Sequence, residues 1–274
     1  MMPITLRVAV VQFRSNSDKT RNLEIAERLI ERAADDDAEL VVLPEMFNCL
    51  GPFPVVLENA EPLEGPTATA MGQLARRLGI HLCAGSICEQ SADPRRGFNT
   101  SLFFGPDGTR LAKYRKIHLF EIDIPGQVQI SESSAMKAGD EIVICRAFGR
   151  NIGFATCYDL RFPELFRQLA SRNAEIICFP SAFTKVTGAA HWRTLVRARA
   201  IENQCFMLAS NQVGQHGENL ESYGHSMIVD PWGVVIAELT TEEEAIAFSE
   251  IDLQQLVKVR TILPALQHRK NFLH

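Results

Sequence analysis

Short apolar runs alternate along the chain with segments whose apolar residues recur at the spacing of a helix. Three runs in the first half predict buried strands, at 6–13, 40–43 and 81–86. The segments between them predict two amphipathic helices, over 18–34 and 67–78, and a loop rich in proline and glycine over 51–66. A turn signal at 105–108 then predicts a hairpin with strands at 100–104 and 110–114. Strand, helix and strand with short connections favour a parallel, right-handed crossover, so the pattern indicates an α/β fold.

The second half of the chain repeats this plan. The sequence aligns with itself in two places, 38–47 with 174–183 and 101–108 with 226–233. We interpret the repeat as a duplicated unit of strand, helix, strand, helix, strand and hairpin. Because the strands are apolar on nearly every residue, both faces of each mixed sheet should be covered. Two sheets packed together with helices outside satisfy this condition, as a single domain over 1–274.

One apolar run, at 152–156, leads to a cysteine at a point where the chain changes from strand to helix. Cys157 ends the run, and Pro163 and Glu164 are suited to the first turn of a helix. A cysteine at such a turn can lie at the mouth of a sheet with backbone N–H groups behind it, where a nucleophile is needed. Taken alone, Cys157 could equally be a small core residue.

Two charged residues end other strands of the predicted sheets. Glu45 follows the strand at 40–43, and Lys116 follows the hairpin strand at 110–114. If the strands end on a common rim, both side chains can meet Cys157 there, where open α/β sheets place their ligand sites. Taken singly, Glu45 could be a carboxylate at a helix N-terminus and Lys116 part of a solvated basic face.

Composition narrows the function classes. A net charge of −5 and a pI near 5.8, without a basic stripe, argue against nucleic-acid binding. The apolar runs are only of strand length, which predicts no membrane span, and the N-terminus lacks the layout of a signal peptide. Seven cysteines, an odd number and mostly within apolar segments, favour a reducing cytoplasmic location over a disulfide framework. Neither a Cys-x-x-Cys nor a His-x-x-x-His pair occurs, so we predict no metal site.

The sequence resembles the nitrilase superfamily, the carbon–nitrogen hydrolases, from Leu6 to about Arg269. The resemblance is carried by three motifs, at 43–47, 114–120 and 153–162. It implies a four-layer αββα sandwich and assembly into a homodimer or larger homo-oligomer through the helix after the cysteine. It also implies that Glu45, Lys116 and Cys157 are catalytic, with a second glutamate, Glu132, orienting Lys116 or the attacking water. On its own, Glu132 would be read as a surface charge in a loop.

The residue types suit the hydrolysis of a small-molecule amide. A cysteine thiolate attacks the carbonyl carbon, and a carboxylate such as Glu45 takes the thiol proton. Lys116 and the backbone N–H of Tyr158 can stabilise the oxyanion. The resulting thioester is hydrolysed by water, and no metal or organic cofactor is required. His118 suggests a Cys–His hydrolase instead, but the sequence indicates no Asn or Asp partner for it.

Further segments resemble the amidase branch that contains deaminated-glutathione amidases and omega-amidases, at 121–126, 187–192 and 223–233. The spacing from 209 to 226 is nearer the first type, and Phe47-Asn48 is nearer the second. We therefore predict hydrolysis of the terminal amide of an α-keto acid, such as deaminated glutathione, to the acid and ammonia. An omega-amidase acting on α-ketoglutaramate or succinamate is the alternative, ahead of a true nitrilase.

A carboxylate-bearing substrate requires an anion-binding residue. Arg161, four residues after Cys157, is the best candidate by position and by its planar guanidinium. The family pattern likewise implies that Arg161 and Thr187 contact the substrate. The alternative for Arg161 is a salt bridge at the helix start, and Phe183 and Trp192 fit either the core or a pocket wall. A binding protein that keeps the fold without turnover is disfavoured, because it would not need all three catalytic residue types.

Overall fold

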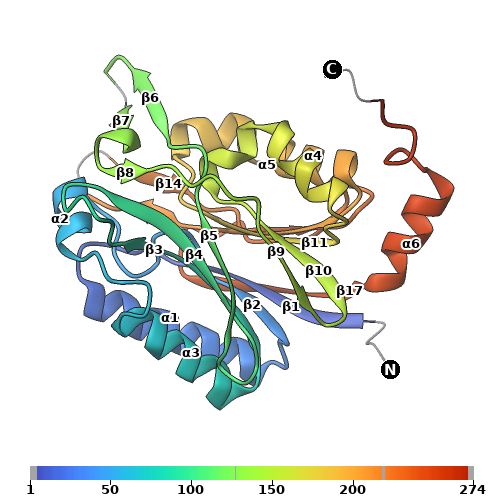
Figure 1. Ribbon diagram of the computed structural model, residues 1–274, viewed down its shortest axis with the longest axis horizontal. Helices are drawn as coiled ribbons and strands as arrows, with labels where there is room; N and C mark the ends of the chain where they lie inside the picture. Colours follow the sequence, from blue (N-terminus) through green and yellow to red (C-terminus); the bar gives the residue numbers. More distant parts are fainter. Residues whose placement is uncertain (1–4, 127, 218–219, 271–274) are drawn as a thin grey trace.

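The computed structural model describes residues 5–126, 128–217 and 220–270, in which two mixed sheets face one another (Figure 1). The first sheet has the order β17-β1-β2-β3-β4-β5, with the short β8 (Met136–Lys137) paired to β4. Its three central strands are parallel and the outer ones antiparallel. The strands are β1 (Thr5–Gln12), β2 (Leu40–Val42), β3 (His81–Glu89), β4 (Gly97–Phe104), β5 (Arg110–Arg115) and β17 (Ala245–Asp252).

The second sheet has the same layout, in the order β16-β15-β12-β11-β10-β9. Its strands are β9 (Ile144–Ala147), β10 (Arg150–Phe154), β11 (Ile176–Ser181), β12 (Phe206–Asn211), β15 (Met227–Val229) and β16 (Val235–Glu238). Leu40 of the first sheet lies between Val8 and His81, on the two neighbouring parallel strands. Its counterpart in the repeat, Ile176, lies between Ile152 and Phe206 in the same way. The predicted repeated halves are therefore confirmed, down to the register of the parallel strands.

Helices cover the outer face of each sheet (Figure 1). The first sheet packs against α1 (Lys19–Asp35) and α3 (Pro66–Leu78), and the second against α4 (Pro163–Ser171) and α5 (Lys185–Asn203). The Asp18 carboxylate caps α1 by accepting a hydrogen bond from the Arg21 N–H, so the predicted helix boundary is correct to one residue. These helices form the first and fourth layers of the sandwich.

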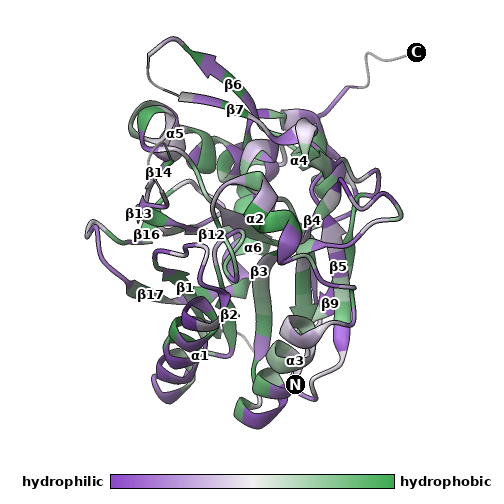
Figure 2. Cartoon of the chain, turned by 90° about the vertical axis from the view of Figure 1, so that its left-hand side faces the viewer, coloured by the Kyte–Doolittle hydropathy of each residue, from purple (hydrophilic) through white to green (hydrophobic). Residues whose placement is uncertain are grey.

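The strands are apolar on both faces because each face packs against a different layer. In β1, Leu6, Val8 and Val10 belong to the core between the sheets, whereas Ala9 and Val11 pack toward the helices. The core between the sheets is completed from the second sheet by Ile152, Phe154, Ile176, Cys178, Phe206, Leu208 and Ile228. Figure 2 accordingly shows mainly hydrophobic colouring along the central strands. The predicted four-layer αββα sandwich is therefore correct.

Several smaller elements lie outside the predicted pattern. The segment predicted as a loop contains a short helix, α2 (Phe53–Glu58), which Pro52 precedes. Two hairpins were not predicted, one of β6 (Glu121–Ile124) with β7 (Val128–Ser131) and one of β13 (Val213–Gln215) with β14 (Glu221–Tyr223). The first hairpin extends away from the sandwich (Figures 1 and 2). The other additions are the strands β8, β9 and β17, the helix α6 (Leu253–Ile262) and two 3-10 turns, η1 (Glu132–Ser134) and η2 (Cys157–Arg161).

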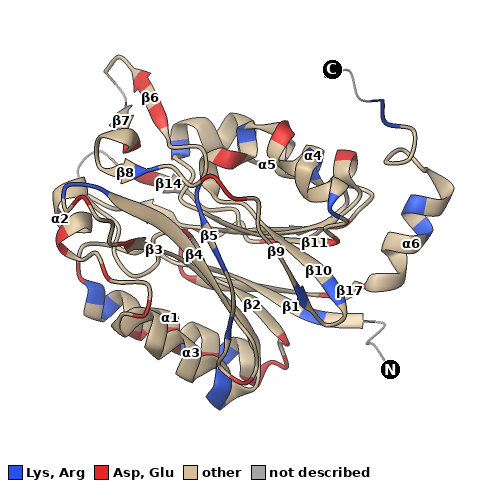
Figure 3. Cartoon of the chain, viewed as in Figure 1, with Lys and Arg blue, Asp and Glu red and all other residues tan. Residues whose placement is uncertain are grey.

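The surface carries both signs of charge. Figure 3 shows Lys and Arg interspersed with Asp and Glu on the helices and at strand ends. In the part of the chain that the structure describes, every helix is too short or too polar to cross a lipid bilayer.

Candidate active site

The loop after β2 holds Glu45 tightly against the neighbouring strand. Met46 adopts the left-handed region with φ of 52°, and its N–H donates to the Ser86 hydroxyl at 2.9 Å. Gly85 also has positive φ, and a side chain there would place its Cβ 2.0 Å from the Pro44 carbonyl oxygen. Glycine is therefore required at this approach, because the Glu45 loop leaves no space for a larger residue.

Cys157 lies on a strained turn between strand and helix. Strand β10 ends at Phe154, and Cys157 opens η2 with φ of 48°, a conformation that non-glycine residues rarely adopt. Thr156 and Asp159 form a capping box, in which the Thr156 N–H donates to the Asp159 carboxylate at 2.8 Å. Such strain persists only where the surroundings hold it, which is a common property of active sites.

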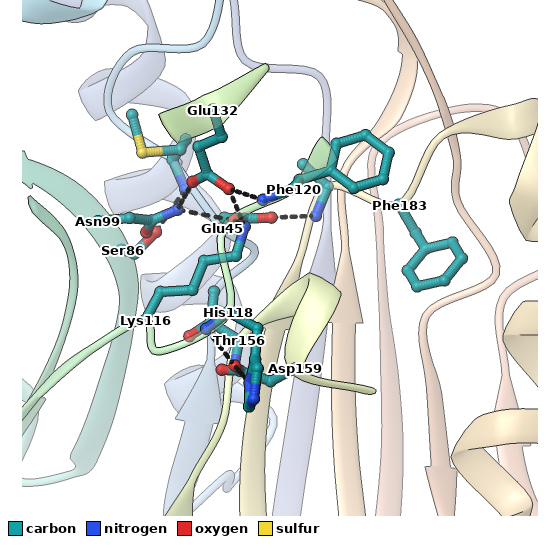
Figure 4. A network of polar contacts seen from close by, with 12 residues as sticks. Glu45, Ser86, Asn99, Lys116, His118, Phe120, Glu132, Thr156, Asp159 and Phe183 are labelled. Carbon is teal, nitrogen blue, oxygen red and sulfur yellow. Dashed lines mark hydrogen bonds and ion pairs between the residues drawn. The ribbon is translucent and has the colours of Figure 1, made fainter. Parts of the chain in front are cut away.

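The fully buried Asp159 carboxylate ties this turn to the end of β5. It accepts hydrogen bonds from the Tyr114 hydroxyl at 2.6 Å and from the His118 N–H at 3.0 Å. The His118 ring nitrogen Nδ1 lies 2.7 Å from the same carboxylate (Figure 4). The His118 ring also stacks on Phe162. His118 thus has the acidic partner that the sequence did not indicate. However, it is not among the residues that line the cavity at Cys157, so it supports the turn rather than acting as a base.

Three charged side chains meet beside the turn in a buried cluster (Figure 4). The Lys116 ammonium lies 3.0 Å from a Glu45 carboxylate oxygen and 2.7 Å from a Glu132 oxygen. Lys116 is 2% exposed, Glu45 3% and Glu132 6%, so water screens these contacts little. The structure therefore brings together the predicted Glu45, Lys116 and Glu132.

Neutral donors complete the hydrogen bonding of the two carboxylates. The Asn99 side-chain amide donates to Glu45 at 2.8 Å and to Glu132 at 3.1 Å. The Ala182 N–H donates to the second Glu45 oxygen at 2.8 Å, and the Phe120 N–H donates to Glu132 at 2.6 Å. Each carboxylate is consequently held in one orientation by donors from different segments.

The environment sets the resting protonation of Lys116 and Cys157. Burial on its own disfavours the Lys116 ammonium, but the Glu132 and Glu45 carboxylates outweigh it and hold the Lys116 pKa well above its ordinary value. Burial raises the pKa of the Cys157 thiol, and the Glu45 carboxylate raises it further against the opposing effect of Lys116. At neutral pH Lys116 is therefore charged and Cys157 is a thiol, which needs a base before it can attack.

All four predicted catalytic residues line one cavity of about 680 Å³. This volume falls within the usual range for small-molecule sites. Cys157, Glu45, Lys116 and Glu132 face it together with Asn99. Much of the remaining wall is apolar, formed by Met46, Leu50, Phe53, Val56, Met136 and Leu220. The arrangement places a nucleophile, a carboxylate and a cation at the edge of an apolar chamber.

The predicted substrate-binding residues Tyr158, Arg161 and Thr187 line a smaller recess, which also includes Cys157. The Arg161 guanidinium lies over the Phe183 ring at 5.0 Å and contacts the His191 ring nitrogen at 3.2 Å. Among the described residues no carboxylate pairs with Arg161, so the alternative of a salt bridge is not observed. The Thr187 hydroxyl contacts that of Thr184 at 2.8 Å.

Sequence reasoning missed two polar residues that organise the site, Asn99 and Asp159. Asn99 lies in β4 one residue before the predicted strand and begins a polar stretch over 99–101, so the hydrophobic pattern gave no signal for it. Of the two aromatic residues left open, Phe183 lines the recess. Trp192 is fully buried in the core, where its indole N–H donates to the His225 carbonyl oxygen at 2.7 Å.

Comparison with known proteins shows the family of the chain. Residues 7–261 match the family model described as carbon-nitrogen hydrolase. The chain is 42% identical to deaminated glutathione amidase of Mus musculus, over 96% of this chain and 83% of that protein. It is 38% identical to omega-amidase NIT2 of Xenopus tropicalis, over 98% of this chain and 96% of that protein.

A longer relative and a solved structure show the same likeness. The nitrilase and fragile histidine triad fusion protein NitFhit of Caenorhabditis elegans is 41% identical over 97% of this chain, which spans only 61% of that protein. The crystal structure of Nit3 from Saccharomyces cerevisiae, described as a member of branch 10 of the nitrilase superfamily, aligns with a TM-score of 0.88. It is 33% identical, and the alignment covers 98% of each chain.

Asn99 offers a test of the buried cluster. Asn99→Leu should lower the free energy of unfolding by about 1–3 kcal/mol, because two buried carboxylates each lose a donor. Asn99→Asp should lower it further at neutral pH, because a third carboxylate then faces the other two. Repulsion raises the pKa of a carboxyl group in the folded state, so Asn99→Asp should regain stability relative to Asn99→Leu as the pH falls to about 5.

Urea unfolding of both variants at the two pH values measures this difference. The prediction fails if the difference in the free energy of unfolding between Asn99→Asp and Asn99→Leu is the same at both pH values. Position 99 would then not face the two carboxylates.

Proposed function

The chain belongs to the carbon–nitrogen hydrolase family, and we propose that it is an amidase that works through a cysteine thioester. The observation that carries this proposal is the shared cavity of Cys157, Glu45 and Lys116. Cys157 is buried as a thiol on a strained turn, and the neighbouring Glu45 carboxylate is positioned to remove its proton. A hydrolase that acts on C–N bonds by nucleophilic catalysis needs this combination of groups.

In the proposed first step, the Cys157 sulfur attacks the amide carbon while the thiol proton passes to Glu45. The carbonyl oxygen becomes an oxyanion, stabilised by the Lys116 ammonium and the Tyr158 N–H. Glu45 then gives its proton to the leaving nitrogen as the C–N bond breaks. A thioester and a free amine result.

Water completes the reaction. Glu45, again a carboxylate, takes a proton from the water molecule that attacks the thioester carbon. The second oxyanion collapses, the acid leaves, and the proton returns to the Cys157 sulfur. Glu132 does not exchange protons in this scheme. Its bond to Lys116 at 2.7 Å instead holds the ammonium in position through both steps.

We propose an α-keto acid amide as the substrate, with its carboxylate beside Arg161. Support comes from the position of Arg161 in the recess next to Cys157, without a carboxylate partner among the described residues. A guanidinium there can hold a carboxylate through two parallel hydrogen bonds.

The size of the main cavity favours deaminated glutathione. Its α-ketoglutaryl group is joined to cysteinylglycine through a secondary amide, so the group that leaves is this dipeptide. Ammonia, the product expected from the sequence, is released only from primary amides such as α-ketoglutaramate. The apolar chamber of about 680 Å³ offers room for a dipeptide that ammonia does not need.

The omega-amidase alternative loses one of its arguments. Phe47 and Asn48, the residues nearer that type, are buried, and neither lines the cavity. Phe47 packs in the core under the helices, and the Asn48 amide donates to Thr67. Phe47 and Asn48 therefore contribute to packing of the loop and do not contact the cavity in which the substrate would bind.

Rates of acid formation distinguish these substrates. Deaminated glutathione and α-ketoglutaramate yield the same acid, α-ketoglutarate, so one assay compares them directly. We expect kcat/KM to be highest for deaminated glutathione, lower for α-ketoglutaramate and succinamate, and negligible for an aliphatic nitrile. Turnover of the nitrile alone would overturn the proposal.

We further propose that the protein forms a homodimer or larger homo-oligomer through the outer face that carries α4 and α5. Exposed apolar side chains on α5 support this, namely Val186 and Ile201. Light scattering of the purified protein measures the assembly, and a monomer at micromolar concentration would contradict it.

Cys157→Ala should reduce amide hydrolysis by at least about 10⁴-fold, because Cys157 is the only thiol among the described residues that line the cavity. Cys145→Ala is the matched control, since Cys145 is half-buried in β9 and does not line the site. Steady-state rates and circular dichroism of both variants check the prediction. Near-normal turnover by folded Cys157→Ala protein would disprove the thioester mechanism.

Lys116→Arg should lower kcat by about 10²–10³-fold, because guanidinium is broader than ammonium and would misplace its donors relative to the oxyanion. Lys113→Arg, on strand β5 just before Lys116 but outside the cavity, serves as the control and should retain activity. A Lys116→Arg enzyme within a few-fold of wild type would exclude Lys116 from oxyanion binding.

Arg161→Met should weaken kcat/KM for a carboxylate-bearing amide by about 10- to 150-fold, the usual value of a charge-assisted pair. A matched uncharged amide should be nearly unaffected, since it never makes the contact. Lysine at this position should recover only part of the loss, because it lacks the planar fork. Equal losses on both substrates would instead assign Arg161 to support of the Cys157 turn.

A further inference from the structure

One buried carboxylate, that of Asp159, contacts the chain on both sides of Lys116. The Tyr114 hydroxyl, two residues before Lys116, donates to Asp159 Oδ2 at 2.6 Å. The His118 N–H, two residues after it, donates to Oδ1 at 3.0 Å, and the ring nitrogen Nδ1 lies 2.7 Å from the same oxygen (Figure 4). Asp159 therefore holds the segment 114–118, in which Lys116 is the central residue.

The same carboxylate contacts the chain on both sides of Cys157. Asp159 is two residues after Cys157, and its Oδ2 accepts a hydrogen bond of 2.8 Å from the N–H of Thr156, the residue before the nucleophile. This bond lies within the turn η2 and does not involve β5. One side chain thus contacts the neighbours of both the nucleophile and the proposed oxyanion donor.

The environment makes each of these donors important. Asp159 and Tyr114 are fully buried, and no Lys or Arg pairs with Asp159 in the part of the chain that the structure describes. The charge of Asp159 is therefore stabilised by hydrogen bonds, and the loss of a donor to a buried carboxylate is costly. Burial, assisted by the Asp159 carboxylate, raises the pKa of Tyr114 well above its ordinary value, so the hydroxyl keeps its proton and donates.

The bonds from Tyr114 and His118 to Asp159 cross between the two sheets. The backbone of Lys116 is held by the first sheet, because its N–H donates to the Asn99 carbonyl oxygen of β4 at 2.8 Å. Its carbonyl oxygen accepts a hydrogen bond from the Gly139 N–H, just after β8, also at 2.8 Å. Cys157 instead follows β10 of the second sheet. The separation of Lys116 and Cys157 consequently depends on side chains that join one sheet to the other.

We propose that Asp159, acting through Tyr114 and His118, is a positioning residue that sets the separation between the Lys116 ammonium and the Cys157 sulfur. This inference rests on the proposed amidase function, in which Lys116 stabilises the oxyanion that forms when Cys157 attacks. Asp159 is not among the residues that line either cavity at Cys157, so it acts through the two segments and not on the substrate.

The expected effect follows from the role of an oxyanion donor. A displacement of about 1 Å within a site can cost about 10²-fold in rate. Because the oxyanion develops in the transition state and is absent from the bound substrate, this loss should appear in kcat rather than in KM.

Tyr114→Phe tests the contact between the sheets. It removes the bond to Asp159 while filling nearly the same space, and the bond from Thr156 to Asp159 within the turn remains. With deaminated glutathione as substrate, kcat should fall by about 10- to 100-fold and KM should change little. Tyr223→Phe, in β14 and outside both cavities, is the matched control and should keep the wild-type values.

Alkylation of Cys157 by iodoacetamide separates positioning from damage to the turn. In this reaction the sulfur displaces iodide, and no oxyanion forms that Lys116 could stabilise. The rate of alkylation at Cys157, followed by peptide mass, should therefore be the same in Tyr114→Phe and in wild-type enzyme.

Two further variants assign the effect to Lys116. In a Lys116→Arg background the oxyanion donors are already misplaced, so adding Tyr114→Phe should lower kcat much less than it does in wild-type enzyme. His118→Phe keeps the backbone N–H and a ring that can stack on Phe162, but it loses the donor at Nδ1. It should therefore lower kcat in the same way as Tyr114→Phe, with KM and alkylation unchanged.

Each outcome supports or overturns the role of Asp159. An unchanged kcat in Tyr114→Phe, a parallel loss of alkylation, or the same loss of kcat in the Lys116→Arg background overturns it and leaves the amidase function standing. Should Tyr114→Phe not fold, the same measurements on His118→Phe decide. If wild-type enzyme cleaves no amide at all, the proposed function and this inference fall together.

Discussion

Lys116 carries a full positive charge at a position that water hardly reaches, and two carboxylates make this possible. Its ammonium contacts Glu45 at 3.0 Å and Glu132 at 2.7 Å. Removing charges from water costs several kcal/mol for each ion, which their mutual attraction offsets only when the geometry is good. The cluster therefore persists only while the segments that contribute it remain in register. Those segments are the loop after β2, the end of β5 and the turn η1.

The same constraint explains the protonation of the nucleophile. With two carboxylates and one ammonium, the cluster carries a net charge of −1 before Cys157 ionises. A thiolate beside it would add a second negative charge in a buried place, so the thiol keeps its proton at rest. In the proposed mechanism this proton passes to Glu45, which keeps the total charge of the cluster and Cys157 unchanged.

The sequence predicts the fold and the charged residues of the site because both depend on where apolar runs end. Glu45, Lys116 and Cys157 each follow a predicted strand, and strands that end on one rim bring their next residues together. Asn99 and Asp159 depend instead on which segment lies opposite them. Asn99 meets Glu45 and Glu132 only after β4 has paired with its neighbours, and Asp159 needs Tyr114 from the other sheet. Such partners are set by tertiary contacts, which hydrophobic periodicity does not encode.

The pairing of β1 with β17 determines when the edge of the first sheet can be completed during synthesis. Thr5 pairs with Asp252 and Gln12 with Ala245, so the first strand of the chain finds one of its neighbours near the other end. During synthesis β1 emerges well before β17, and its edge on that side has no partner until β17 leaves the ribosome. An unprotected strand edge invites pairing with other chains. The closing strand therefore limits how long the nascent chain is exposed to aggregation.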